Sequence, residues 1–267
     1  MKKKIANLPT NYFGLIKASL QLYRASFDRT IILSFLFTLF IFIPNILAII
    51  TGTPLFIFTS FTVQQLWFLM VQLIGTALYV AILWRMHCVL RGIHELMTDD
   101  LKMGVEKVLY IIASIVVATL ILFGVFLLVI GIHHWLQYNQ FNLMSHPILL
   151  SVLFIWLGII VLYICSLFIF FAPLIVTENY GVFTSLKRSA SLVWNHWGRV
   201  ITTQITPWVV YVLIMTLFRY LFKLDILMYG IYAIGFTFVH ILVVTLLLPW
   251  LAALSLMQLK DLELRNK

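Results

Sequence analysis

The chain has 267 residues, of which 63% are hydrophobic and 10% are charged, and its formal net charge at pH 7 is +9. Soluble globular domains carry roughly 25% charged residues, and the mean hydropathy of +1.07 indicates lipid as the solvent for most of this chain. The Lys and Arg residues are spread over short segments between apolar runs, with no basic domain, so nucleic acid is not an expected partner.

Six apolar stretches are long enough to cross a bilayer, because about 20 helical residues rising 1.5 Å each span a hydrocarbon core of roughly 30 Å. The prediction is an all-α membrane protein, a single domain over residues 1–267, with about six transmembrane helices arranged as three hairpins. The stretches cover residues 30–50, 62–84, 108–132, 148–176, 201–222 and 226–257.

Two segments at the ends of apolar stretches predict amphipathic helices at the membrane interface. In residues 1–29, the side chains of Phe13, Ile16, Leu20, Tyr23 and Phe27 recur at intervals of three and four, with polar residues between them. Residues 177–200 repeat this pattern, and six of 19 positions are identical when residues 13–31 are aligned with 183–201. We infer a unit of one interfacial helix and one transmembrane hairpin, used three times, with the loop 85–107 as its least regular copy.

The basic residues predict the orientation of the chain. Sixteen of the 18 Lys and Arg lie before residue 30, in 85–107, in 177–200 or after residue 257, whereas Arg219 and Lys223 lie on the other side. Such an excess marks the cytoplasmic side of membrane proteins, so both termini are expected in the cytoplasm.

Six cations in the two interfacial segments are candidates for binding anionic phospholipid headgroups. Near an anionic surface each cation contributes roughly 1 kcal/mol. The alternative is that they only orient and anchor the protein. The candidates are Lys17, Arg24, Arg29, Lys187, Arg188 and Arg199.

Gln72 and His240 lie near the middle of the second and sixth stretches. Polar side chains at that depth are costly and mark either a functional site or an interhelical hydrogen bond. No carboxylate lies at midspan to complete a proton relay, which favours the packing role.

No catalytic residue, metal or cofactor is predicted. His133, His134 and His146 share an outer loop that has no Asp, Glu or Cys. His87 and His94 lie beside Cys88 and Glu95, but the sequence H-E-L-M-T does not complete the metalloprotease motif. Serine-hydrolase and phosphate-loop motifs are also missing, and Cys88 and Cys165 are expected to be free thiols.

Residues 172–194 read A-P-L-I-V-T-E-N-Y-G-V-F-T-S-L-K-R-S-A-S-L-V-W. This segment resembles the YciC-like inner-membrane proteins of bacteria and, more distantly, the membrane domain of some glycerophosphoryl diester phosphodiesterases. The resemblance implies a helical fold in the bacterial inner membrane and brings no agreed activity, and no phosphodiesterase domain accompanies it here. The residues that carry it are Ala172, Pro173, Glu178, Gly181, Arg188, Ser189 and Leu192.

This motif also predicts local structure. Pro173 is expected to end or bend the fourth span, Gly181 to permit a turn, and Thr177 or Asn179 to cap the helix that follows.

Three functions remain open on the sequence. The leading hypothesis is a non-enzymatic inner-membrane protein that supports envelope or lipid homeostasis by contacting lipid or a partner membrane protein. The alternative is a small transporter or lipid-moving protein with a path beside His240 or Gln72, and the third is a membrane-embedded hydrolase.

Overall fold

A computed structural model describes residues 11–51, 61–93, 95–138, 147–221 and 231–266. These ranges contain helices and no strand, which confirms the predicted all-α class. The helices are α1 (Tyr12–Thr51), α2 (Phe61–Arg91), α3 (Met97–Tyr138), α4 (Pro147–Leu167), α5 (Phe171–Glu178), α6 (Val182–Val193), α7 (Trp197–Leu221) and α8 (Ile231–Arg265).

Six helical segments of the described chain are long and apolar enough to cross a membrane, and each overlaps one predicted stretch. The chain is therefore a multi-pass membrane protein. The segments are Tyr12–Leu47, Gln65–Arg91, Met97–Gly131, Ile155–Glu178, Trp197–Leu221 and Ile234–Arg265.

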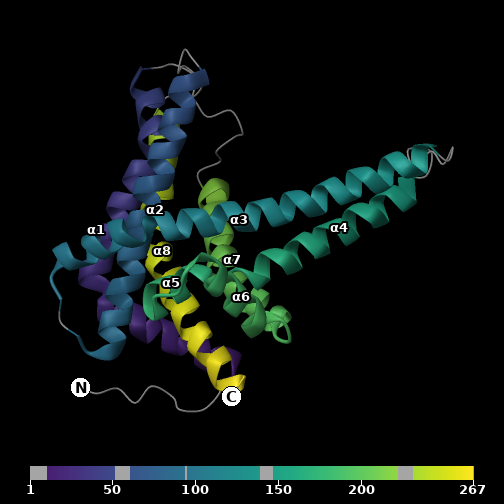
Figure 1. Ribbon diagram of the computed structural model, residues 1–267. Coiled ribbons are helices and arrows are strands. Elements are labelled where there is room, and N and C mark those ends of the chain that lie inside the picture. The colour runs from purple at the N-terminus through teal and green to yellow at the C-terminus, as the bar shows by residue number, and fades with distance from the viewer. Residues whose placement is uncertain (1–10, 52–60, 94, 139–146, 222–230, 267) are drawn as a thin grey trace.

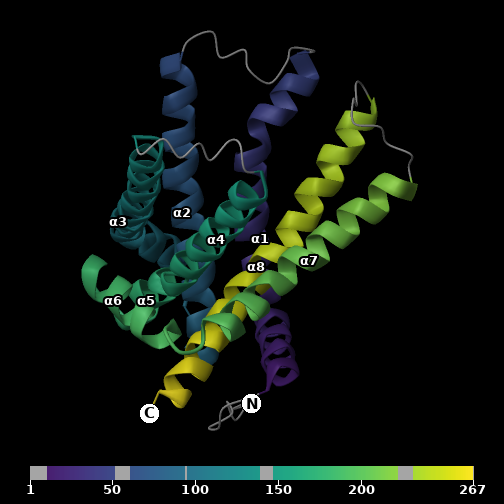
Figure 2. The ribbon, with the colours of Figure 1, turned by 90° about the vertical axis from the view of Figure 1, so that its right-hand side faces the viewer.

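Helices α1, α2 and α8 form the centre of the molecule, with α7 beside α8 (Figures 1 and 2). Their shared core contains Leu33 of α1, Ile82 of α2 and Leu256 of α8, each almost fully buried. Helix α3 crosses α2 near its own start and then runs away from the central helices together with α4 (Figure 1). The crossing is close, because a Cβ atom built on Gly104 would lie 2.4 Å from the carbonyl oxygen of Ala77.

Helix α1 is continuous where a boundary near residue 30 was predicted. The face that packs on α8 carries small polar side chains such as Ser19, whose hydroxyl accepts a hydrogen bond of 3.1 Å from the indole of Trp250. In the predicted apolar stripe, Phe13 is 78% exposed and Leu20 and Phe27 are each 37% exposed, whereas Ile16 and Tyr23 are half-buried. Small residues let two helix backbones approach closely, and the larger apolar residues remain available to lipid.

The segment 177–200 also differs from the prediction, because it contains the end of α5, the separate helix α6 and the start of α7. The helix is interrupted at residues 168–170, between the end of α4 and the start of α5. Pro173 follows in the first turn of α5, where its missing N–H costs little. Gly181 is the N-cap of α6 without a side-chain hydrogen bond, and Asn179 ends α5 in the left-handed conformation with φ of 57°. The predicted cap by Thr177 or Asn179 is therefore wrong.

Candidate functional site

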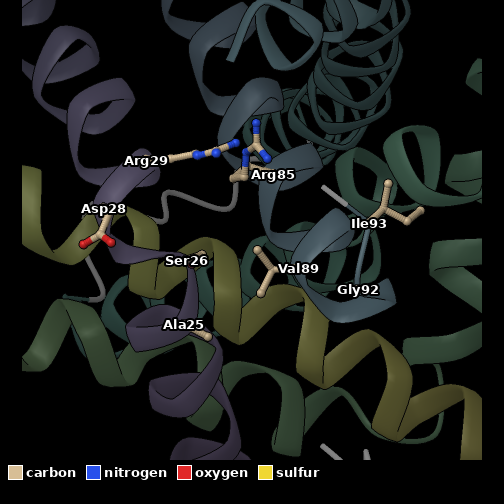
Figure 3. Close-up of a pocket in the computed structure, with 8 residues that line it drawn as sticks. All are labelled: Ala25, Ser26, Asp28, Arg29, Arg85, Val89, Gly92 and Ile93. Carbon is tan, nitrogen blue, oxygen red and sulfur yellow. The ribbon is translucent and has the colours of Figure 1, made fainter. Parts of the chain in front are cut away.

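A pocket of about 240 Å³ lies between α1 and the end of α2. In Figure 3 the side chains of Arg29 and Arg85 extend toward one another along one wall, and Asp28 turns away from them. We call the described parts of the segments predicted to be cytoplasmic the basic end; these are residues 12–30, 85–93, 95–102, 178–199 and 258–265. The pocket is lined by Ala25, Ser26, Asp28, Arg29, Arg85, Val89, Gly92 and Ile93.

The end of α2 is fixed by a glycine in the left-handed conformation. Gly92 has φ of 73°, and the backbone N–H groups of Gly92 and Ile93 donate to the carbonyls of Val89 and Cys88 at 3.3 and 2.9 Å. This pair of bonds is a Schellman motif, which favours glycine because a Cβ atom strains the left-handed conformation. The motif turns the chain so that the carbonyl of Glu95 comes back toward α2.

Arg85 is held by two acceptors and is only 3% exposed. Its Nε donates to Oδ2 of Asp100 at 2.7 Å, and its Nη2 lies 2.5 Å from the same oxygen. Both Nη atoms also donate to the carbonyl oxygen of Glu95 at 3.0 Å. Every nitrogen of this guanidinium is therefore engaged, and the ion pair with Asp100 neutralises its charge.

Arg29 differs from Arg85 although the two share an acceptor. Its Nη1 donates to the Glu95 carbonyl at 2.5 Å, while the side chain remains exposed. Within the described residues no carboxylate lies in ion-pair distance of Arg29. Arg29 therefore brings a positive charge and further N–H donors to the wall of the pocket.

The carboxylate of Glu95 points to a different set of partners. The indole of Trp84 donates to Oε2 at 2.7 Å, the thiol of Cys88 lies 3.4 Å from the same oxygen, and His87 stacks on Trp84 with ring centroids 5.6 Å apart. No group of three or more His, Cys, Asp or Glu that fits a metal ion occurs in the described part of the chain. His94 and His146 lie outside the described residues, as does the side chain of His133, while His134 is exposed.

The six predicted headgroup ligands divide into two kinds. Lys17, Arg24, Arg29, Lys187 and Arg188 are exposed. Arg199 instead forms an ion pair of 3.1 Å with Asp261, which also pairs with Arg265. Of the six, Arg29 is the one that lines the pocket.

The motif residues at 172–194 contact the break between α4 and α5. The hydroxyl of Ser189 donates to the carbonyl of Leu167 at 2.6 Å and accepts from the N–H of Phe170 at 3.1 Å. Leu192 is 1% exposed in the core beneath, whereas Glu178 and Gly181 are exposed. Ser189 thus satisfies backbone groups that the broken helix leaves without partners.

The two midspan polar residues have different surroundings. His240 hydrogen-bonds through Nε2 to the hydroxyl of Tyr211 on α7, and its ring lies 4.7 Å from that of Phe42 on α1. Gln72 is exposed on α2, and no hydrogen bond joins it to any described residue. The structure does not bring these two side chains together.

Sequence reasoning missed two buried polar clusters. One is the ion pair of Arg85 and Asp100. The sequence features that could have predicted it are an Arg at the end of an apolar run and an acidic residue at the start of the next helix. The other joins α7 and α8, where Gln204 donates to Gln258 at 2.8 Å and accepts from Ser255 at 3.3 Å.

Comparison with protein-family models, curated proteins and solved structures finds no match to this chain. The resemblance carried by residues 172–194 therefore stays a prediction, and function is inferred from the geometry of this chain.

Proposed function

We propose that this chain is a non-enzymatic, multi-pass protein of the bacterial inner membrane, with both termini in the cytoplasm, that binds anionic phospholipid headgroups at its basic end. Through this contact it supports envelope or lipid homeostasis. One observation carries the proposal. Arg29 lines a pocket between two membrane helices and has no carboxylate partner among the described residues.

Phosphate is the anion that fits this arrangement best. A guanidinium offers parallel N–H donors that match two oxygens of a phosphate, and charge-assisted bonds of this kind are about twice as strong as neutral ones. Arg29 is the ligand in this proposal, and Arg85 is its support, because the donors of Arg85 already contact Asp100 and Glu95.

Other cations of the basic end favour the same ligand. Lys17 and Arg24 are exposed on α1, and Lys187 and Arg188 are exposed on α6. Each cation near an anionic surface contributes roughly 1 kcal/mol, and this attraction does not depend on fine geometry. The exposed cations therefore draw anionic lipid to the basic end, and the pocket supplies the specific contact.

The experiment compares lipid retention by the full chain and two single variants. Purified protein is exchanged into nanodiscs that contain phosphatidylglycerol or phosphatidic acid in a phosphatidylcholine background, and bound lipid is counted by native mass spectrometry. Because a hydrogen bond to a charged group contributes about 1.5–3 kcal/mol, R29Q should weaken anionic lipid binding by about ten- to a hundredfold.

The matched control is R188Q, which removes an exposed guanidinium on α6 that does not line the pocket. Its effect should stay within about fivefold, the loss expected from nonspecific attraction. Equal retention by wild type and R29Q, or equal loss in both variants, would contradict the assignment of Arg29.

A further inference from the structure

Helix α2 exposes an amide side chain at the depth of the hydrocarbon. Gln72 stands 13 residues before Arg85 and 11 after Phe61, which places it about 20 Å and about 16 Å from these ends along the helix. Its side chain is exposed, and it has no hydrogen bond with the described residues. Polar residues in membrane helices almost always face protein or a water-filled cavity, because lipid tails offer no hydrogen bonds.

Eight of the ten side chains from Gln65 to Ile74 are exposed, and one row of positions along this part of α2 contains both Gln65 and Gln72. Gln65, Leu69 and Gln72 are exposed and Thr76 is half-buried, and these positions are separated by four, three and four residues. Alternation of three and four is the seam of two helices that pack in a left-handed coil. Gln65 likewise has no hydrogen bond with the described residues, so neither amide of the seam has a donor or an acceptor partner within the described part of the chain.

Helix α3 does not cover this seam. It crosses α2 at Ala77 through Gly104 and then turns away from the central helices (Figure 1). Leu69 remains 56% exposed, and its neighbours Leu66 and Phe68 are 61% and 63% exposed.

From these observations we propose that the seam Gln65, Leu69, Gln72 and Thr76 binds the same seam of a second copy of this chain. The carboxamide of Gln both donates and accepts hydrogen bonds, so it is complementary to itself. Every copy carries the same distribution of Lys and Arg and inserts in the same orientation. Two α2 helices related by a twofold axis along the membrane normal therefore run parallel, and Gln72 meets Gln72 of the other copy. A polar residue at one seam position also fixes register and favours the dimer.

The test uses single cysteines in the full chain. In a background with C88A and C165S, L69C is cross-linked in native membranes by oxidation of the two thiols to a disulfide with the membrane-permeant oxidant copper phenanthroline. The matched control is L120C, which replaces a leucine of α3 that is 62% exposed, similar to Leu69. We expect a cross-linked dimer from L69C and none from L120C.

The second measurement needs no cysteine replacement, so its result remains valid even if the C88A and C165S replacements impair folding. The stoichiometry of the fluorescently labelled wild-type chain in vesicles is measured by single-molecule photobleaching over a range of protein-to-lipid ratios. Interhelical hydrogen bonds in membranes predict that Q72L lowers the dimer association constant by about three- to twentyfold. Q72N should preserve the dimer, because Asn is self-complementary too.

Three outcomes would overturn the proposal. They are a wild-type chain that is monomeric at all ratios, equal cross-linking of L69C and L120C, and L69C cross-linking only to a different membrane protein. These results are independent of the lipid assay, because Gln72 lies about 20 Å along α2 from the arginine pocket.

Discussion

Arg85 and Asp100 form an ion pair that is almost completely excluded from solvent, with 4% and 0% of the two side chains exposed. The pair joins the end of α2 to the first turn of α3. The second carboxylate oxygen, Oδ1, accepts no hydrogen bond from the described residues. Because burial removes the hydration of both charges, the pair stabilises the fold only while both partners are present.

R85M should therefore lower the free energy of unfolding by about 3–5 kcal/mol, because it leaves the carboxylate of Asp100 buried without a counter-charge. The double variant R85M/D100L should recover most of that loss, since no charge is then buried. Thermal unfolding of the purified chain in one detergent measures both. A double variant no more stable than R85M would show that the pair contributes more than charge neutralisation.

Ser189 shows how much of a residue's role can be predicted from the sequence. Its place in the 172–194 motif was visible in the sequence, but its two hydrogen bonds to Leu167 and Phe170 were not. The acceptor and donor lie about 20 positions earlier, and they become unsatisfied only because the helix breaks there.

At the scale of helices, close packing depends on small residues at contact positions. Helix α1 presents Ser19 to Trp250 of α8, and α3 presents Gly104 to the backbone of Ala77. Without a hydrophobic driving force between helices in lipid, such close approach supplies the van der Waals contact that holds them together.

The α2–α3 crossing gives a prediction with a control in the same helix. G104A places a Cβ atom 2.4 Å from a backbone oxygen, so one of the helices must shift at a cost of about 1–3 kcal/mol. G124A meets nothing within 4 Å and should be neutral or stabilising by up to about 1 kcal/mol through helix propensity. Unfolding midpoints of the two variants test this, and equal shifts would argue against the crossing.

For the molecule as a whole, the helices are enclosed to very different degrees. Within the most apolar window of each span, 56% of the α8 residues are buried, compared with 11% in α3. Helix α8 is therefore central, and the large apolar side chains of α3 are left to lipid or to other proteins. Figure 2 shows α7 and α8 side by side, with α1 and α2 beyond them.

The orientation of the whole molecule is predicted from its charge and can be measured. In a cysteine-free background, K102C replaces a lysine whose side chain is 75% exposed, and N142C lies in the segment predicted to be the second outer loop, outside the described residues. An impermeant maleimide should label N142C in cells whose outer membrane is opened, and K102C only after the inner membrane is permeabilised. Labelling of both sites in detergent is the control, and the reverse pattern would contradict the predicted orientation.

The sequence by itself determined the membrane class, the six apolar helices and the segregation of Lys and Arg, because run length, composition and charge are local properties. It placed helix boundaries less well. The continuous α1 and the break at 168–170 depend on packing against α8 and on Ser189 of α6. Only the tertiary structure brought Arg29, Arg85 and the carbonyl of Glu95 to one pocket wall and left Gln72 exposed. Those features depend on how distant helices cross, and hydrophobic periodicity does not encode the partner of a helix face.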